Sequence, residues 1–402
     1  MVDFDVIVVG GSFAGLNFAR CASLLGLTVL LVDKDRDIGS SVRTTGIFTK
    51  ELVEDMNIPK KLISNTVKKI KLYSPNMNVT ELSSKKNVFF MSYTGDFLKY
   101  LADNAEAFGT KISTNTSYLD SKIKEDIIEV NLEMKHKKKT VTTRFVVGAD
   151  GAHSKVAKEF GLSKNTTLMV GIERVYAHAK GVKDDEFHCF LDRKLAPGYM
   201  AWVAKRGKQT YVGLAGLEKE IDVKHAIHDF QKKVNLLFDF KRAKLITTKS
   251  GFMPINGILE KTVNDKCLLV GDAAGHLGAL TAGGIYPAIK HSKDAANAVA
   301  DYLILNKRSA LLKYTLKCLK DKHLKTEFIL RKIYNKMKSN DVLNEVFEMF
   351  KSEDGKKLFS AFFFEDPEKH HVIINELRII LQHPKIYHVI GKDLLKELEH
   401  TL

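Results

Sequence analysis

Apolar and polar positions in the first 35 residues follow the pattern of strand, turn, helix and strand. Residues 4–9 form a mostly apolar run typical of a buried strand, and a glycine-rich turn follows it. Residues 13–25 show helical spacing of apolar positions, and residues 28–32 form a second strand-like run that ends at Asp33. Because glycines and an arginine interrupt this region, strand-helix-strand explains it better than a membrane span.

Two later segments repeat the change from an apolar strand to a turn of small residues. The first, RFVVGADGAHSKVAKEFG, covers residues 144–161 and passes through Asp150 before a helix start. The second covers residues 266–303, with a strand that ends at Gly271-Asp272, a glycine-rich loop and a long helix. No charged side chain follows Asp272 until Lys290, so the backbone of this loop is unusually bare.

The rest of the chain separates into strand-rich and helix-rich parts. Alternation of apolar and polar residues predicts hairpins at 67–82 and 126–147. Between residues 166 and 255 most apolar runs are short, which favours an antiparallel sheet. Helical patterns cover residues 96–109 and the chain from about residue 306 onward.

These patterns predict an α/β fold with a Rossmann-like dinucleotide-binding domain, an inserted antiparallel-sheet substrate domain and a C-terminal helical region. The length of 402 residues is sufficient for two or three domains. The expected boundaries are residues 1–60, 85–160 and 262–305 for the first domain, 61–84 and 161–261 for the second, and 306–402 for the helical region.

Charge and cysteine content indicate where such a protein works. A net charge of +15 indicates an anionic partner or surface, or simply serves solubility. The four cysteines are widely spaced and include no CxxC pair, so we expect neither a disulfide framework nor a metal site, and a reducing compartment is favoured. The start of the chain is unlike a signal peptide. We therefore expect a cytoplasmic protein that can contact a membrane peripherally and binds no nucleic acid.

The first glycine-rich turn has the spacing of a dinucleotide-binding motif. Gly10 allows the tight turn and Gly15 lets the helix and strand pack closely, while Ser12 stands where the middle glycine is usual. The helix N-terminus offers N–H groups to a pyrophosphate, and Asp33 can accept hydrogen bonds from ribose hydroxyls. The alternative is a strand-helix-strand unit that binds no ligand.

The three segments together resemble the FAD-binding set of the flavoprotein hydroxylase superfamily. The resemblance implies that Asp272 binds the ribityl or ribose part of FAD and that the loop at 276–284 passes the flavin ring. A helix from Ile285 would then aim its N-terminus at the pyrimidine edge of the ring. The candidate FAD-binding residues are Gly10, Ser12, Ala14, Gly15, Asp33, Lys34, Arg43, Asp150, Gly271, Asp272, Gly283, Gly284 and Ile285.

Details within residues 1–305 also resemble the geranylgeranyl reductase family. The similar segments are LTAGGIYPAIKHSKDAA (280–296), APGYMAWVAKRGKQTYVGLAGL (196–217) and GFMPINGILEKTVNDKCLLVGDAAG (251–275). The resemblance implies an FAD-dependent oxidoreductase that reduces isolated double bonds of isoprenoid chains, in membrane lipids or in the tails of chlorophylls and quinones. Such an enzyme takes an isoprenoid lipid as its substrate and needs an external electron donor.

Some positions depart from the pattern of that family. Ala204-Lys205 stands where Phe-Pro follows the hairpin tryptophan, and Thr44-Thr45 stands where a cysteine often lies next to the flavin. Met200 replaces an aromatic residue, and Ala279 stands at a common proline. These differences concern the shape of the substrate and any thiol-dependent role, and they have little effect on the fold or on FAD.

Reduction of an isolated alkene requires a proton donor that faces the flavin and is shielded from water. The candidate donors are Tyr199, Tyr286 and His276. Packing in a core explains the two tyrosines equally well, and an exposed loop position is the preferred interpretation of His276. Met200 and Trp202 share one face of their predicted strand, which suits a tunnel for a prenyl chain and equally suits a core.

Two functions of other classes fit the same fold. An FAD-dependent monooxygenase would hydroxylate an aromatic or apolar substrate, but the run at 280–288 differs from the motif common in hydroxylases. A redox-inactive lipid carrier would keep the fold without its chemistry. We rank the reductase first, the monooxygenase second and the carrier third.

The helical region begins with a strongly basic stretch. Residues 306–340 contain eleven lysines and arginines and only two acidic residues. Leucines recur at helical spacing in the same stretch, among them Leu312 and Leu316, so its helices are predicted to be amphipathic. We expect either that this region docks on an anionic membrane surface, or that its apolar stripe packs on the FAD domain and its lysines are simply solvated.

Overall fold

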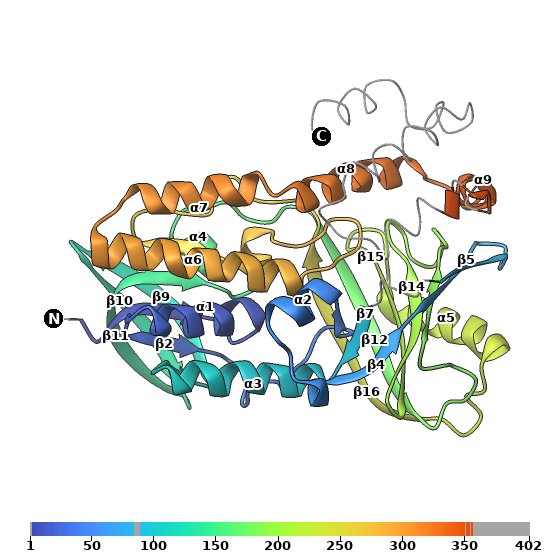
Figure 1. Ribbon diagram of the computed structural model, residues 1–402, viewed down its shortest axis with the longest axis horizontal. Helices are drawn as coiled ribbons and strands as arrows, with labels where there is room; N and C mark the ends of the chain where they lie inside the picture. The colour runs from blue at the N-terminus through green and yellow to red at the C-terminus, as the bar shows by residue number, and fades with distance from the viewer. Residues whose placement is uncertain (1, 84–88, 350, 354, 357–402) are drawn as a thin grey trace. The chain divides into compact units, whose positions relative to one another are not determined.

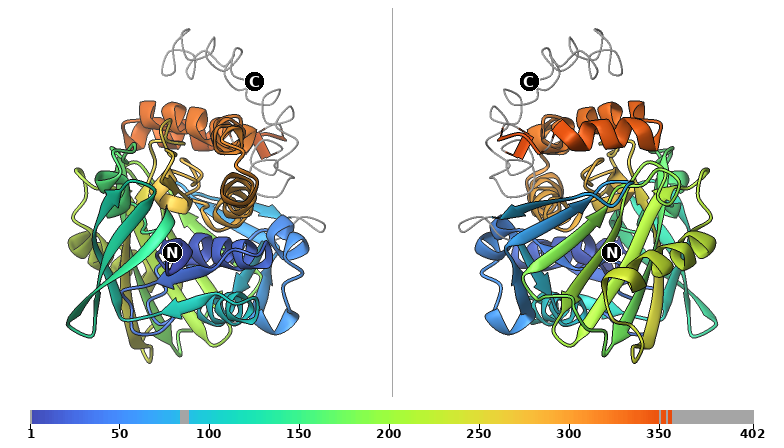
Figure 2. Two further views of the ribbon diagram at one scale, coloured as in Figure 1. Left: turned by 90° about the vertical axis from the view of Figure 1, so that its left-hand side faces the viewer. Right: turned by 90° about the vertical axis from the view of Figure 1, so that its right-hand side faces the viewer.

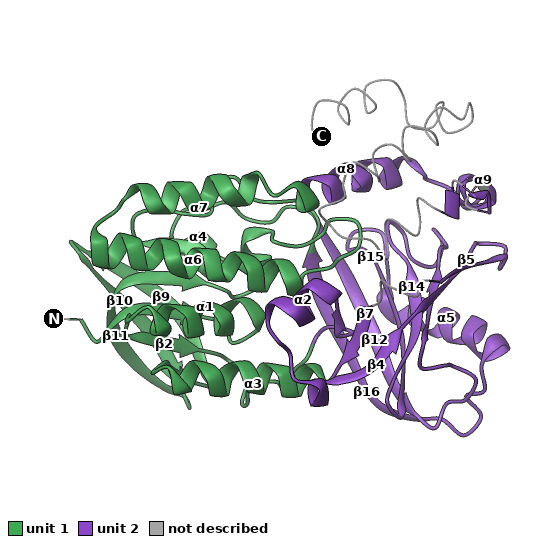
Figure 3. Cartoon of the chain, in the orientation of Figure 1, with its two compact units in different colours: residues 1–42, 93–167, 254–324 green, residues 43–92, 168–253, 325–402 purple. Residues whose placement is uncertain are grey.

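The computed structural model describes residues 2–83, 89–349, 351–353 and 355–356 (Figures 1 and 2). The fold is α/β, as predicted, and the chain forms two compact units (Figure 3). Unit 1 consists of residues 1–42, 93–167 and 254–324, and unit 2 of residues 43–92, 168–253 and 325–402. The part of the predicted helical region beyond residue 356 lies outside the described residues.

The two units divide the chain at other positions than the predicted domain boundaries. Residues 43–60 and 85–92 belong to unit 2, where strands β3 (Ile47–Phe48) and β4 (Ile63–Val67) both pair with β7 (Phe89–Ser92). Residues 306–324 belong to unit 1, where helix α7 (Ser309–Leu319) packs along α6 (Ile285–Leu305). Strand pairing and helix packing between segments far apart in sequence set the boundaries of the two units. A local hydrophobic pattern does not reveal such long-range contacts.

The sheet of unit 1 combines a parallel half with an antiparallel half. Its strand order is β8-β2-β1-β11-β10-β9, and β17 also pairs with β11. The bounds are β1 (Phe4–Val9), β2 (Val29–Val32), β8 (Lys111–Ser113), β9 (Thr116–Lys124), β10 (Ile127–Met134), β11 (Lys137–Gly148) and β17 (Cys267–Leu269). Strands β8, β2, β1, β11 and β17 run parallel, and β11, β10 and β9 form the antiparallel extension. The β10–β11 pair confirms the hairpin predicted at 126–147.

Several helices of unit 1 follow directly after the loops at the ends of these strands. They are α1 (Phe13–Leu24), α3 (Thr94–Ala107), α4 (Lys155–Glu159), the 3₁₀ helix η2 (Gly271–Ala274), α6 and α7. Helix α1 packs against both α3 and α6, and it lies between them in Figure 1. The buried Asn17 of α1 donates to the backbone oxygen of Ile289 and to Ser292 Oγ, both at 2.9 Å. This contact fixes α6 against α1, and the sequence pattern gave no sign of it.

Unit 2 is built on an antiparallel sheet with one parallel pair. Its order is β16-β12-β15-β14-β13-β5-β6, and the small sheet β3-β7-β4 lies in the same unit. The remaining bounds are β5 (Lys69–Tyr73), β6 (Val79–Ser83), β12 (Leu168–Ala177), β13 (Glu186–Phe190), β14 (Ala201–Arg206), β15 (Gln209–Leu217), β16 (Lys244–Pro254), α2 (Lys50–Asp55), η1 (Lys60–Leu62), α8 (Lys322–Lys336) and α9 (Asn340–Met349). The β5–β6 pair confirms the hairpin predicted at 67–82.

One helix lies within the region where the sequence predicted mostly short strands. Helix α5 (Val223–Leu237) begins where Asp222 accepts hydrogen bonds from the N–H groups of Lys224 and His225, at 3.0 and 3.2 Å. Its buried residues include Ile227 and Phe230, which belong to the same core cluster as residues on one face of the large sheet. The predicted sheet is present, but the sequence analysis did not identify this helix within it.

Candidate functional site

Several loops of unit 1 begin at the carboxyl ends of parallel strands, at one edge of the sheet. The strand ends are tied to one another, because Gly10 N donates to Val32 O at 2.9 Å and Ala149 N donates to Val9 O at 2.8 Å. The loops after β1, β2, β11 and β17 therefore start from neighbouring positions. In open parallel sheets, ligands bind at this edge.

The turn after β1 has space only for glycine at two positions. Gly10 has a φ of +112°, and a Cβ there would lie 2.2 Å from the backbone oxygen of Ala149. A Cβ at Gly15 would lie 1.9 Å from the backbone oxygen of Gly10. Gly11 N donates to Asp33 Oδ2 at 2.5 Å, so the turn and the end of β2 are also joined. These contacts bring the helix start close to the strand end, as the motif requires.

The N-terminus of α1 is arranged to receive an anion. Ser12 occupies the N-cap position but makes no side-chain capping bond, and the first turn contains no acidic residue. The N–H groups and the positive dipole end are therefore available to a phosphate. Asp33 Oδ1 accepts from Asp35 N at 2.7 Å, which orients a carboxylate that can still accept from ribose hydroxyls.

The carboxylate of Asp150 is hydrogen-bonded to residues at the start of α4. Its carboxylate accepts from Ser154 Oγ at 2.6 Å and from the N–H groups of Lys155 and Val156 at 2.7 and 3.1 Å. Burial raises the pKa of Asp150 in spite of these bonds. Asp150 therefore holds the start of α4, and its predicted contact with FAD remains a prediction.

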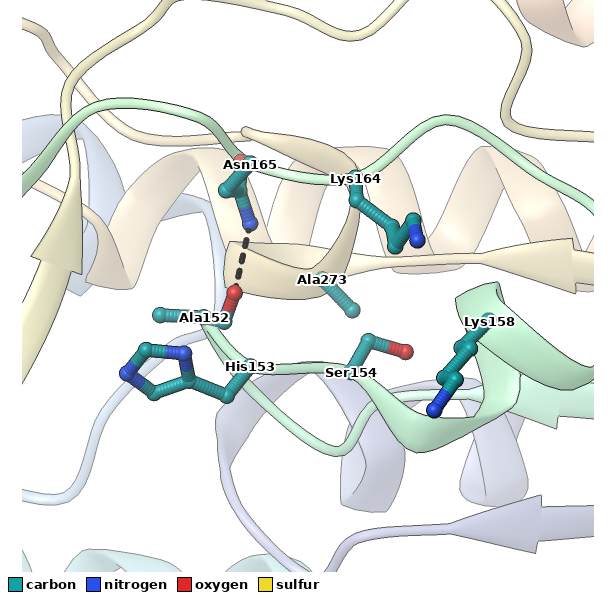
Figure 4. A pocket seen from close by; sticks show the side chains of 7 residues that line it. All are labelled: Ala152, His153, Ser154, Lys158, Lys164, Asn165 and Ala273. Carbon is teal, nitrogen blue, oxygen red and sulfur yellow. Dashed lines mark hydrogen bonds between the residues drawn. The ribbon is translucent and has the colours of Figure 1, made fainter.

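A small cavity opens beside this loop (Figure 4). Its volume is about 220 Å³, and its lining is Ala152, His153, Ser154, Lys158, Lys164, Asn165 and Ala273. Asn165 Nδ2 donates to the backbone oxygens of Ala152 at 3.0 Å and of Asp272 at 2.8 Å. Asn165 thus joins the loop after β11 to the loop after β17. The sequence analysis missed this role, because an asparagine in a loop carries no periodic signal.

The loop after β17 places Asp272 in a low-polarity setting. Burial raises the pKa of Asp272 to about 6. A Cβ added at Gly284 would lie 3.5 Å from Asp272 Oδ1, so the backbone at Gly284 passes close to this carboxylate. Gly271 has a φ of +62°, and a Cβ there would lie 2.9 Å from Ala14 Cβ. A carboxylate in this position gains stability when hydroxyl groups donate to it.

The loop at 276–284 leads directly into α6. Helix α6 begins at Ile285, as predicted, with Gly284 at its N-cap and no acidic residue in the first turn. The loop is folded on itself, since Ala282 N donates to Gly278 O at 2.8 Å and Gly278 N to Gly283 O at 3.1 Å. A second helix N-terminus, with little side-chain cover, therefore stands next to Asp272.

These features fit a dinucleotide with a flat ring. They supply glycine turns, two uncapped helix N-termini and the two carboxylates of Asp33 and Asp272. All predicted cofactor residues lie in unit 1 except Arg43, which is an exposed residue of unit 2. Lys34 is also exposed. Among the described residues, no group of three or more His, Cys, Asp or Glu side chains could hold a metal ion.

The fold is shared with solved structures. The crystal structure of a geranylgeranyl bacteriochlorophyll reductase-like protein from Thermoplasma acidophilum superimposes with a TM-score of 0.83. The match covers 99% of both chains at 22% sequence identity.

Sequence comparisons identify the family. A family profile described as FAD binding domain matches residues 3–323. A digeranylgeranylglycerophospholipid reductase of Methanocella arvoryzae is 31% identical over 309 residues, which cover 74% of this chain and 78% of the relative. A protein of the same name from Methanocaldococcus jannaschii is 28% identical over 352 residues, which cover 86% and 90%. The chain belongs to the geranylgeranyl reductase family of FAD-dependent oxidoreductases.

FAD is therefore the cofactor of this flavoprotein, and unit 1 carries the residues that fit it. Gly10, Ser12 and Gly15 surround the helix start that suits the pyrophosphate. Asp33 and Asp272 offer acceptors to hydroxyl groups, and the bare loop before Ile285 leaves room for a ring. The contact of each residue with FAD remains a prediction.

His276 of the flavoprotein is not the exposed loop residue that the sequence favoured. Its side chain is completely buried, and its ring lies 4.5 Å from the ring of His291, centroid to centroid. Neither ring nitrogen has a hydrogen-bond partner among the described residues. Burial lowers the pKa of His276 well below its usual value, so the imidazole is neutral at pH 7. The preferred interpretation was wrong because neighbouring helices cover the loop.

A hydrogen bond between side chains of two strands spans the strand between them in the large sheet of unit 2. Glu173 of β12, Gly213 of β15 and Trp202 of β14 are direct neighbours across the strands, so they lie on one face. Trp202 Nε1 donates to Glu173 Oε2 at 3.0 Å. The indole reaches over Gly213, since a Cβ there would lie 2.4 Å from the Trp202 ring. A glycine is required at this position for Trp202 to reach Glu173.

Other polar groups converge on the same carboxylate. Thr45 Oγ1 donates to Glu173 Oε2 at 2.6 Å, and Lys249 Nζ lies 3.9 Å from Glu173 Oε1. Burial lowers the pKa of Lys249. Thr45 belongs to the Thr44-Thr45 pair singled out in the sequence, and its hydroxyl is held by the buried Glu173. The sequence analysis did not identify Glu173, because no motif contains it and only cross-strand pairing brings it to Trp202.

The other predicted site residues fall in both units. Tyr199, Met200 and Trp202 belong to unit 2, and His276 and Tyr286 belong to unit 1. Tyr199 is buried, and burial raises the pKa of its hydroxyl. Tyr286 is half-buried in the first turn of α6. Met200 and Trp202 are half-buried against the apolar cluster of unit 2 that contains Phe89, Phe187 and Phe347.

We expect Gly213→Ala to displace the indole of Trp202. The added methyl group overlaps the ring, and relief of such overlap costs about 1–3 kcal/mol of folding stability. Because Trp202 is the one tryptophan of the chain, its fluorescence reports this movement alone. A red shift of the emission and a lower melting temperature are the expected measurements.

Gly171→Ala provides a matched control for this substitution. Gly171 lies on the same sheet, and a Cβ there would meet the flexible Met253 Cε at 3.1 Å instead of a ring. Its emission spectrum should equal that of the wild type. An unchanged spectrum and melting temperature for Gly213→Ala would contradict the inferred dependence of Trp202 on this glycine.

Proposed function

We propose that this flavoprotein reduces carbon–carbon double bonds in the geranylgeranyl chains of a glycerophospholipid. What carries the proposal is that relatives matching most of the chain are named digeranylgeranylglycerophospholipid reductase. The glycine turns and carboxylates of unit 1 support it, because they fit the redox cofactor that such a reaction needs. The bound and reduced flavin supplies the hydride, and an external donor supplies its electrons.

The protein itself must supply a proton to the second carbon of the double bond. Tyr199 and Tyr286 are the favoured candidates, because a phenol is protonated at pH 7 and can give that proton. Burial raises the pKa of Tyr199, which makes this phenol the weaker acid. His276 is a weaker candidate, since its buried ring is neutral and has no proton to give without forming an imidazolate. Shielding from water keeps the donated proton at the reacting carbon.

Unit 2 has a surface suited to an isoprenoid chain. Met200 and Trp202 border an apolar cluster of aromatic and aliphatic side chains. We propose that these two residues contact the prenyl chain. The hydrogen bond from Trp202 to Glu173 would fix the orientation of the indole. Ala204 and Lys205 stand where the resemblance implies a Phe-Pro pair, so we expect the surface that contacts the prenyl chain to differ there.

The decisive experiment is a product analysis under anaerobic conditions. Dithionite-reduced protein is incubated with a glycerophospholipid that carries two geranylgeranyl chains, and the lipid is analysed by mass spectrometry. We expect a gain of two hydrogen atoms for each reduced bond, together with reoxidation of the flavin spectrum. Tyr199→Phe and Tyr286→Phe should separate the proton donors, because loss of the donor slows reoxidation but not flavin reduction.

Other outcomes of this experiment identify the alternatives. A product that gains an oxygen atom, and only in air, would establish the monooxygenase and overturn the proposal. A flavin that stays reduced with every prenyl lipid and an unchanged lipid would indicate a carrier. The flavin-free Asp272→Ala protein serves as the negative control for lipid chemistry.

We also propose that the protein meets its substrate as a peripheral membrane protein of the cytoplasmic compartment. No helix among the described residues is long and apolar enough to span a bilayer. A lipid with two geranylgeranyl chains is a bilayer component, so the enzyme must reach it at the membrane surface. The excess of basic residues in 306–340 is consistent with contact with anionic headgroups.

A further inference from the structure

Helices α6 and α7 of unit 1 expose large apolar side chains where one helix ends and the next begins. The exposed fractions are 54% for Ile304, 53% for Leu305, 62% for Leu312 and 45% for Leu316. Leu312 and Leu316 are four residues apart, so they lie on the same face of α7. These four residues, together with the basic residues of 307–320, are called the α6–α7 corner below.

The exposed leucines of α7 are not needed to pack the helix. Ala310, Leu311, Tyr314 and Cys318 are buried and form its inward face. The predicted stripe of apolar residues therefore divides. Its members in α8, such as Leu330 and Ile333, are buried, whereas Leu312 and Leu316 point away from the core of unit 1. Packing of α8, whose residues from Lys325 onward belong to unit 2, thus accounts for part of the stripe and leaves the corner unexplained.

Cations surround the exposed apolar groups. The corner contains Lys307, Arg308, Lys313, Lys317 and Lys320, and residues 302–320 include no aspartate or glutamate. Two acids next to the corner, Asp294 and Asp321, are already paired. Asp294 accepts from Lys317 at 2.7 Å, and Asp321 accepts from Lys290 at 3.0 Å and lies 3.2 Å from His291 Nε2. The described residues offer no ion-pair partner to Lys307, Arg308, Lys313 or Lys320.

We infer that the α6–α7 corner is the surface by which the protein docks on an anionic phospholipid bilayer. Leu312, Leu316 and the end of α6 enter the interfacial region, and the lysines beside them contact lipid phosphates. This arrangement of apolar and basic groups is typical of helices that lie in a membrane interface. Each lysine near an anionic leaflet contributes about 1 kcal/mol at moderate salt. The inference rests on the proposed function, because a bilayer lipid as substrate explains why an anionic membrane is the occupant.

Charge complementarity selects the bilayer over the other occupants of an apolar face. A second copy of this chain would bring an identical basic corner, and like charges would oppose each other. The chain after residue 356 contributes both acidic and basic residues, so its composition does not match a strongly basic surface. An anionic bilayer satisfies the apolar and the basic groups together.

The test is co-sedimentation of the full-length, FAD-loaded protein with vesicles that contain no prenyl lipid. Vesicles of phosphatidylcholine are compared with vesicles that also contain phosphatidylglycerol, at low and high salt. We expect binding to the anionic vesicles only, and a steep loss of binding at high salt. Lys313→Gln/Lys320→Gln should weaken binding about tenfold or more. Leu312→Gln/Leu316→Gln should remove the fraction of binding that persists at intermediate salt.

Matched controls remove equal charge or apolar area elsewhere. Lys60→Gln/Lys61→Gln alters two exposed lysines of unit 2, and Leu236→Gln/Leu237→Gln alters two exposed leucines of α5. Both controls should bind like the wild type. Flavin absorbance and melting temperature verify that each variant is folded.

Three results would overturn the inference. The first is wild-type binding that is absent or equal on neutral vesicles. The second is unchanged binding by both corner variants. The third is a concentration-dependent dimer that the leucine variant abolishes while vesicle binding is absent. Because the vesicles hold no substrate, docking can succeed when the product analysis fails, so the two proposals are tested separately.

Discussion

Gly15→Ala is expected to abolish flavin binding and to lower the stability of unit 1. The new Cβ would lie 1.9 Å from the backbone oxygen of Gly10 and 3.2 Å from Ala149 Cβ. Neither the oxygen nor the start of α1 can move without breaking the contact between β1 and the helix. Relief of such an overlap costs about 3 kcal/mol, at the upper end of the range for overpacking. The displaced helix start would no longer present its N–H groups to the pyrophosphate.

The measurements are the flavin content of the purified protein and its melting temperature. Gly251→Ala is the matched control, since a Cβ there meets only Arg43 atoms at 3.5 Å or more. That variant should purify with a full flavin spectrum. If Gly15→Ala also retained its flavin, the turn would not be the tight contact described, and the pyrophosphate would have to bind elsewhere.

Asp272→Ala should also lose most of its flavin, but without unfolding. A hydrogen bond to a charged group contributes about 1.5–3 kcal/mol, so loss of one such bond raises Kd roughly 10- to 100-fold. Asp272 lies beside Gly284 in a setting that raises its pKa to about 6, and removal of its charge does not harm the fold. Fluorescence titration with FAD measures the affinity, and the melting temperature of the flavin-free protein should stay constant or rise.

The pH dependence of binding tests the same carboxylate. In the flavin-free protein Asp272 is protonated below about pH 6 and ionised above it, because burial raises its pKa. If Asp272 contacts the cofactor as predicted, the cofactor's hydroxyl groups stabilise the ionised form and lower the pKa of Asp272. FAD should therefore bind more weakly as the pH falls through 6, by at most about tenfold per pH unit. The affinity of Asp272→Asn should not show this dependence.

Removal of a carboxylate outside the candidate FAD-binding residues provides the control. Asp126→Ala removes a fully exposed carboxylate of unit 1 and should bind FAD like the wild type at every pH. Equal affinities for Asp272→Ala and the wild type would show that the carboxylate does not contact the flavin.

Local sequence was sufficient to predict those helices and strands whose bounds depend on neighbouring residues in the chain. The bounds of β1, α1 and α6 follow from apolar periodicity and from glycine, because a strand, a turn and a helix start are decided within a few residues. The same reasoning selected Gly10, Gly15 and Asp272 as candidate cofactor residues, since a motif of fixed spacing describes one loop and one helix end. The resemblance of the three segments to FAD-binding motifs predicted the cofactor.

Contacts between distant segments were beyond that reasoning. Glu173 reaches Trp202 only because β12, β15 and β14 are adjacent, and Asn165 joins two loops that are more than a hundred residues apart in sequence. Helix α5 was missed for a different reason: its buried residues Ala226, Ile227, Phe230 and Val234 have helical spacing, but they lie between runs that predict strands. Each of these features depends on register or topology.

The sequence by itself determined that this protein has a glycine-rich dinucleotide cradle, an α/β fold and a basic helical region. The tertiary structure alone decided which side chains of those elements are covered. It buried His276, whose loop sequence resembles that of an exposed segment, and it left Leu312 and Leu316 exposed although their spacing suits a core. The physical reason is that a helical or loop pattern specifies which residues share a face, whereas burial depends on the neighbouring element that packs against that face.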